Sequence, residues 1–161
     1  GNGSISNNDY YGNVTHTISV KNLLASAADY HNPVDEDTLS EVTSRFDARH
    51  RVIARTVWKS ALGDIDPNNV PIASDNNDAV LGLTTRYEYF DSAVGTDNAI
   101  IEMALAKLAE QNAGVAYFDG INADGSAVLV TNAEGEVSVQ INDGGGRSVF
   151  SGAFGKTAPI Q

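Results

Sequence analysis

The chain has 161 residues, a formal net charge of −11 and no cysteine. Its length suits one domain with a possible small appendage, and the lack of cysteine excludes disulfide frameworks and thiolate metal sites. The acidic balance excludes a protein that coats nucleic acid with its whole surface, although it leaves room for one local basic face. Because no apolar run reaches about 18 residues, we expect no transmembrane helix and no membrane partner.

The first predicted element is a hairpin over residues 3–20. Apolar and polar residues alternate from Val14 to Val20, and a stretch rich in Asn, Asp and Gly over residues 7–13 precedes them. Alternation at period two is typical of a half-buried strand, and the Asn/Asp/Gly cluster indicates the turn.

The next segment, "RFDARHRVIARTVWKS" over residues 45–60, holds five of the ten lysine and arginine residues. Residues 35–60 are compatible with a helix that begins at an acidic turn, or with a strand. We favour a strand from about residue 49 to 60, because β-branched residues are frequent there. Only a strand also places all the cations of this segment on one face: Arg45, Arg49, Arg51, Arg55 and Lys59.

Three further elements follow towards the middle of the chain. Residues 64–78 are polar and predict a long loop, and residues 80–90 alternate as a second strand. Residues 96–112 carry an apolar stripe at helical spacing and end before Gly114, so we expect a helix capped by Thr96 or Asp97.

The tail is predicted to be β-structure. Residues 127–130 and 137–141 flank a turn and read as a hairpin, and three glycines at 144–146 link it to a short strand near Val149. We therefore expect a β-rich C-terminal extension over residues 119–161.

The basic strand admits two interpretations. Its arginines can pair with the surplus carboxylates of an ordinary solvated face. Alternatively, they can bind nucleic acid, because alternate residues on a strand lie roughly 6.6 Å apart, close to the spacing of phosphates along one strand. The concentration of positive charge in an acidic chain favours the second interpretation.

The remaining motifs indicate no catalysis. The sequence lacks a GxSxG elbow, a P-loop and the histidine spacing of zinc sites, so we expect a protein that is not an enzyme. Asp64, Asp66 and Asn68 resemble the opening of a calcium loop, but Asn69 stands where that loop has glycine. A polar turn is the favoured interpretation, with a weak calcium site as the alternative and no other cofactor.

After the basic strand comes "LGLTTRYEYFDSAVGTDNAIIEMALAKLAEQ", an aromatic strand that runs into a turn and an amphipathic helix. With the N-terminal hairpin, this order of elements over residues 3–118 resembles the coat proteins of single-stranded RNA bacteriophages (levivirus type). The resemblance implies an α+β fold, in which an N-terminal hairpin and antiparallel sheet are followed by a C-terminal amphipathic helix that packs on a dimer partner. It also implies a coat-like domain over residues 1–118.

The resemblance assigns roles to two sets of residues. The RNA-facing set would be Arg45, Arg49, Arg51, Arg55, Lys59, Thr84 and Arg86. The helix stripe that packs on the partner subunit would be Ile101, Leu105 and Leu108.

The function that the resemblance implies is a structural capsid protein of a bacteriophage virion. It would form homodimers, self-assemble in the host cytoplasm into an icosahedral shell, and enclose single-stranded RNA against a basic sheet face. Two alternatives stay open: another virion or filament component such as a tail-tube or decoration protein, and a secreted calcium- or carbohydrate-binding β module.

Overall fold

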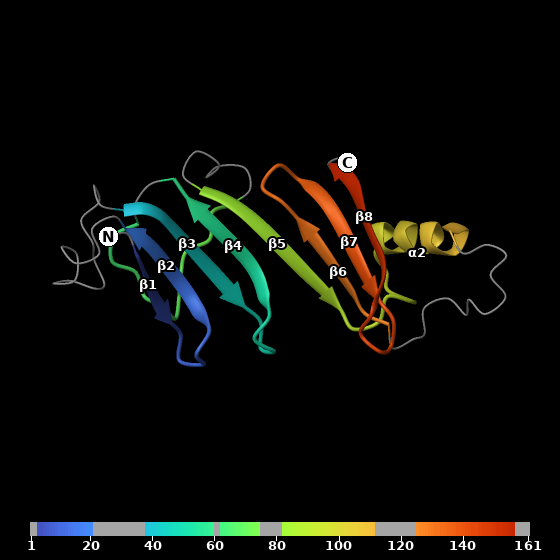
Figure 1. Cartoon of the computed structure of the whole chain (residues 1–161), viewed down its shortest axis with the longest axis horizontal. Helices are drawn as coiled ribbons and strands as arrows, with labels where there is room; N and C mark the ends of the chain where they lie inside the picture. The colour runs from blue at the N-terminus through green and yellow to red at the C-terminus, as the bar shows by residue number, and fades with distance from the viewer. Residues whose placement is uncertain (1–2, 21–37, 60–61, 75–81, 112–124, 157–161) are drawn as a thin grey trace. The chain divides into compact units, whose positions relative to one another are not determined.

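The computed structural model of the chain describes residues 3–20, 38–59, 62–74, 82–111 and 125–156 (Figure 1). Eight strands, each antiparallel to the neighbours it pairs with, follow one another in chain order, and one helix is present among these residues. The elements are β1 (Gly3–Asn8), β2 (Val14–Val20), β3 (Thr38–Phe46), β4 (Val52–Trp58), β5 (Gly82–Phe90), α2 (Ala99–Gln111), β6 (Ala127–Thr131), β7 (Glu136–Asn142) and β8 (Ser148–Lys156). The α+β prediction is therefore wrong: the fold is mostly β.

The chain forms two compact units, Gly1–Arg86 and Tyr87–Gln161, and β5 runs across the boundary between them. The boundary predicted at residue 118 lies outside the described residues. The first unit contains the β1–β2 and β3–β4 hairpins, and the second contains β6, β7, β8 and α2.

The strand predicted from about residue 49 to 60 is present as β4, with shorter bounds. The basic segment as a whole is not one strand, because it also contains the end of β3 and a turn over residues 47–51. The predicted strand near residues 80–90 and the helix are present, although the helix begins at Ala99. Its cap is Asn98 rather than Thr96 or Asp97, because Asn98 Oδ1 accepts hydrogen bonds from the backbone N–H groups of Ile100 and Ile101.

Four of the hairpins share one five-residue turn. In the β7–β8 turn, Asp143 Oδ1 accepts the backbone N–H groups of Gly145 and Arg147, at 2.9 and 3.0 Å. Its Oδ2 accepts the Nε of Arg147 at 3.0 Å, and its backbone pairs with Gly146 and Arg147. An Asx side chain thus satisfies the N–H groups that the turn leaves unpaired. The same scheme of bonds recurs at Asp9–Asn13 and Asp47–Arg51. It also recurs at Asn132–Glu136, except that the bond between the two side chains is reversed, with Asn132 Nδ2 donating to Glu136 Oε2.

The fourth position of this turn requires a positive φ. Gly12, Gly135 and Gly146 occupy it with φ of 87°, 85° and 82°. In the β3–β4 turn the residue is His50, at φ 61°, and it is the one non-glycine residue with positive φ among the described residues. A side chain with a Cβ is strained there, so His50 stands where the local backbone favours glycine.

One face of the first unit's strands, here called the covered face, packs against residues 62–74. The hydroxyl of Thr43 donates to Pro71 O, and Thr84 donates to Ala73 O at 2.8 Å. The Ala73 N–H donates in turn to Thr56 Oγ1, whose hydroxyl lies 2.7 Å from that of Thr84. These buried threonines pair the backbone groups of a segment that has no strand or helix of its own.

The covered face also holds a buried ionisable pair. His16 Nε2 lies 2.6 Å from Glu41 Oε1, and both side chains are 3% exposed. The other carboxylate oxygen, Oε2, accepts the backbone N–H of Leu62 at 2.8 Å. Every polar atom named here has a partner, which is what burial at this depth demands.

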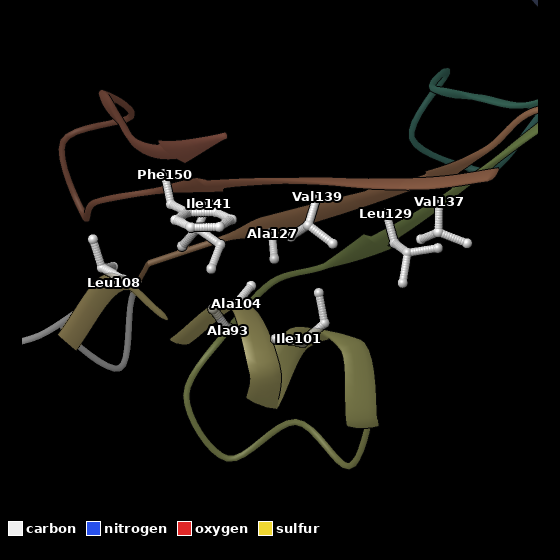
Figure 2. Packing of buried hydrophobic residues seen from close by; sticks show 10 residues of the cluster. All are labelled: Ala93, Ile101, Ala104, Leu108, Ala127, Leu129, Val137, Val139, Ile141 and Phe150. Carbon is white, nitrogen blue, oxygen red and sulfur yellow. The ribbon is translucent and has the colours of Figure 1, made fainter. Parts of the chain in front are cut away.

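The second unit has an apolar core between α2 and the strands β6, β7 and β8, which Figure 2 shows in close view. Ile101, Ala104 and Leu108 project from the helix and are 0%, 0% and 3% exposed. Alternate residues of the strands meet them, and the cluster also contains Ala93, Ala127, Leu129, Val137, Val139, Ile141 and Phe150.

Acid should loosen the turns that begin with aspartate. The pKa of Asp143 is lowered, chiefly by the backbone hydrogen bond from Arg147; that of Asp47 is lowered chiefly by the backbone hydrogen bond from Arg51. A lowered pKa in the folded state stabilises the fold above the unfolded value of about 3.9, and this contribution is lost as the pH falls through the folded value. Amide NMR shifts should therefore move at Arg147 below about pH 4.

The β6–β7 turn supplies the internal comparison for this titration. Its first residue, Asn132, has no titrating carboxyl. In an Asp143→Asn variant the Oδ1 acceptor remains, so the acid response at Arg147 should disappear while the hairpin persists. An unchanged response in this variant would contradict the assignment to Asp143.

Removing one member of the buried pair should be costly. Glu41→Ala leaves His16 and the Leu62 N–H without their acceptors, and we expect a loss of about 3–5 kcal/mol in the free energy of unfolding, measured by urea titration. The double variant His16→Ala/Glu41→Ala should lose less than the sum of the two single variants. Strict additivity would mean that the two side chains do not interact.

Candidate nucleic-acid interface

The second face of the first unit's strands, here called the open face, is the side opposite residues 62–74. The strand register aligns Thr17, Val42, Val57 and Leu83 in one row. The next row aligns Ser44, Arg55 and Thr85. With Ser6 beside Thr17 and Ile53 two residues before Arg55, the open face consists of Ser6, Thr17, Val42, Ser44, Ile53, Arg55, Val57, Leu83 and Thr85.

The open face has an unusual composition for an acidic chain. It carries one cation, Arg55, several hydroxyl groups and no carboxylate. The carboxylates of the first unit lie elsewhere among the described residues: Asp9 and Asp47 in turns, Glu41 on the covered face, and Asp64 and Asp66 in the segment that packs against that face. The positive potential of Arg55 is therefore not cancelled by a neighbour on the same face.

The surroundings of Arg55 combine polar and apolar groups. Arg55 is exposed, and within the described part of the chain its side chain makes no hydrogen bond or ion pair. Along β4 it lies between Ile53 and Val57, which are 37% and 43% exposed, and Leu83 beside Val57 is 45% exposed. The result is a guanidinium surrounded by hydroxyls and accessible hydrocarbon.

The prediction that all five cations share one face is wrong. Arg45 is in register with Ala54, on the covered face, where its Nε and Nη2 donate to Val70 O at 3.1 and 2.9 Å. Arg86 is also in register with Ala54 and so lies on the opposite side from Arg55. The reason is the turn at residues 47–51, which divides the segment into two strands, together with a bulge between Arg45 and Phe46.

Arg49, Arg51 and Thr84 also lie away from the open face. Arg49 and Arg51 belong to the β3–β4 turn, where Arg51 Nε binds Asp47 Oδ2 at 2.9 Å. Thr84 is 4% exposed and is engaged with Thr56. Lys59 directly follows β4 and is exposed. Of the seven residues in the predicted set, Arg55 alone lies on the open face as its register defines it.

The candidates for a weak calcium site, Asp64, Asp66 and Asn68, lie in a polar turn, which is the interpretation that the sequence favoured. Asp66 Oδ1 accepts the backbone N–H of Asn68 at 2.9 Å, while Asn68 Oδ1 accepts the backbone N–H of Tyr10 at 2.7 Å. Within the described ranges, no three His, Asp or Glu side chains are grouped so that they could hold a metal ion. Asp64 and Asp66 therefore carry no metal assignment.

The predicted dimer stripe lies inside the second unit. Ile101 and Leu108 belong to the core between α2 and the β6–β8 strands (Figure 2). Leu105 is partly buried and packs against this core. These side chains are covered by their own chain, which corrects the prediction that they pack on a partner subunit. The three extra strands occupy the face of the helix that the resemblance reserved for the partner.

The sequence interpretation missed the apolar part of the open face. Ile53, Val57 and Leu83 alternate with buried Ala54, Thr56 and Thr84, so the period-two signal was present. What it could not show is which of the two faces residues 62–74 would cover.

The described helix, with 13 residues, is too short to cross a membrane.

Comparisons of the chain with protein-family models, with curated protein sequences and with solved structures gave no match.

The helix stripe provides a direct test of its location. Leu108→Ala should lower the free energy of unfolding by about 2–5 kcal/mol, because it leaves a cavity in the core of the second unit. The loss should not depend on protein concentration, whereas an interface residue would show such dependence. Leu83→Ala, on the open face, is the matched control and should change stability by no more than about 0.5 kcal/mol.

Proposed function

We propose that this chain is a non-enzymatic structural subunit of a virion and that its open face contacts enclosed single-stranded RNA. The observation that carries the proposal is the segregation of charge: in a chain of net charge −11, the open face holds Arg55 and no carboxylate. An anionic polymer is the partner that this distribution of charge favours, because elsewhere on the chain it would meet repulsion.

The chemistry of the face suits a backbone contact of low sequence specificity. Arg55 supplies a guanidinium for a phosphate, and the hydroxyls of Ser44 and Thr85, in register on either side of it, can donate to phosphate or ribose oxygens. Val57 and Leu83 offer accessible hydrocarbon to unstacked bases. Single strands are the favoured form of RNA, because their splayed bases can reach such a surface.

The proposal differs in one respect from the coat-protein arrangement. Since the stripe of α2 packs within its own unit, assembly must use surfaces other than Ile101 and Leu108. The sheet face and the hairpins of the resemblance remain part of the proposal, and the helix contact does not.

A second candidate is a tail-tube or decoration subunit in which the open face packs against another protein chain. The observation that favours it is the exposure of Ile53, Val57 and Leu83 at 37%, 43% and 45%. Interface cores are depleted in charge, whereas RNA contacts need it, so the role of Arg55 separates the two candidates.

Arg55→Gln should weaken binding of a short oligouridine in fluorescence anisotropy and lower the slope of log affinity against log salt by about 0.7, the value for one phosphate contact on a single strand. Lys156→Gln, which removes the same charge from the end of β8, is the control and should leave the slope unchanged.

Size-exclusion chromatography with and without nuclease completes the test. Particles that carry nuclease-protected RNA, and that retain less of it in the Arg55→Gln variant, would support the proposal. Assemblies free of RNA would favour the second candidate. A monomer that binds no oligouridine at low salt would contradict both candidate functions.

A further inference from the structure

The first unit contains a cavity of about 530 Å³ at the end of the sheet where the β1–β2 and β3–β4 turns lie. Both turns line it, together with residues 67–70, and it meets the open face only at Ser44 and Ile53. Its volume lies within the range of small-molecule sites, which is about 300–1,000 Å³. Phe46, Ile53 and Val70 give it an apolar wall.

The backbone conformation of His50 indicates that this cavity has a function. It lines the cavity from the one turn position where glycine is replaced by a residue with a side chain, at φ 61°. The three equivalent turns keep glycine there and make the same backbone hydrogen bonds. Strain that a glycine would remove tends to persist where the side chain has a function.

A chain of hydrogen bonds orients the His50 ring. Asp9 Oδ2 accepts the Nδ2 of Asn13 at 2.9 Å, which fixes the amide so that its Oδ1 faces His50. His50 Nδ1 lies 3.0 Å from that oxygen and must donate to it. In the neutral ring, Nε2 is then an acceptor, and the His50 ring makes no other hydrogen bond within the described part of the chain.

The cavity offers donors and an aromatic ring as well. Arg45 uses Nε and Nη2 to bind Val70 O, so its Nη1 keeps two N–H donors that form no hydrogen bond within the described ranges. Tyr11 is 79% exposed and meets the His50 ring edge to face, with centroids 6.1 Å apart. The amide of Asn69 adds one more donor and acceptor to the lining.

The charge of the lining disfavours an anion. Asp9 and Asp47 both line the cavity, and both have a lowered pKa, from the side-chain hydrogen bond of Asn13 and the backbone hydrogen bond of Arg51 respectively. Two carboxylates therefore stand against the single guanidinium of Arg45. A phosphate-bearing ligand would be repelled, while a neutral ligand would not.

We propose that this cavity binds one sugar unit of a neutral saccharide. A ring with hydroxyls around its edge and C–H groups on its face matches the interleaved donors and acceptors of Arg45, His50 and Asn69, and the exposed ring of Tyr11. Each sugar hydroxyl can both donate and accept, so it can pair with His50 Nε2 as well as with Arg45 Nη1. The site adjoins the proposed RNA contact, with which it shares Ser44, but neither requires the other.

Saturation-transfer NMR on the full chain tests the proposal, with the methyl glycosides of glucose, galactose, mannose and N-acetylglucosamine as probes. At least one probe should show transfer. Tyr11→Ala should weaken its binding about tenfold, the loss expected for one aromatic contact. Tyr10→Ala is the matched control, because Tyr10 is the neighbouring residue, is 89% exposed and does not line the cavity.

His50→Gly gives a second, independent readout. Glycine suits the backbone at this position, so the variant should fold, and its 1H–15N spectrum should confirm this, yet saccharide binding should weaken. Transfer to none of the four glycosides would overturn the proposal. So would equal transfer in the Tyr11→Ala and Tyr10→Ala variants, or preferential binding of adenosine monophosphate.

Discussion

The structure depends above all on the Asx side chain that begins each five-residue turn. One oxygen of Asp9, Asp47, Asn132 or Asp143 accepts two backbone N–H groups, and this ties the third and fifth residues of the turn to the first. Because the return strand begins at the fifth residue or directly after it, the same bonds set the register of each hairpin. The register then decides which side chains each face receives, since a slip of one residue exchanges the two faces.

This constraint explains how the first unit separates its two chemistries. One face receives His16, Glu41 and the buried threonines, and their polar atoms pair with one another or with the backbone of residues 62–74. The alternate residues form the open face, where Arg55 keeps its charge exposed among hydroxyls and hydrocarbon. Stability and the proposed recognition of RNA thus reside on opposite sides of the same strands, so that a change at Arg55 need not disturb the core.

The turns also bring the proposed saccharide site into existence. The β1–β2 turn supplies Tyr11 and Asn13, and the β3–β4 turn supplies His50 in place of a fourth glycine. The hydrogen bond that His50 Nδ1 donates to Asn13 Oδ1 joins the two turns, so the ring is oriented by a residue 37 positions away in the chain. The β1–β2 and β3–β4 turns therefore line a cavity as well as reversing the chain, whereas the β6–β7 and β7–β8 turns do not line it.

The sequence by itself determined the elements whose signals are local. The hairpin over residues 3–20, the strand near 82–90, the helix at 99–111 and the tail hairpins follow from alternation, helical spacing and Asn/Asp/Gly turns. The β3–β4 turn was not predicted, because His50 occupies the fourth position, where the other three turns have the glycine that indicates a turn. Only the tertiary structure decided what covers each face. The apolar stripe of Ile101 and Leu108 indicates that this side of the helix is buried, and the structure shows that β6–β8 of the same chain bury it, not a second subunit. The physical reason is that periodicity reports which residues are buried, whereas the surface that buries them is set by contacts distant in sequence.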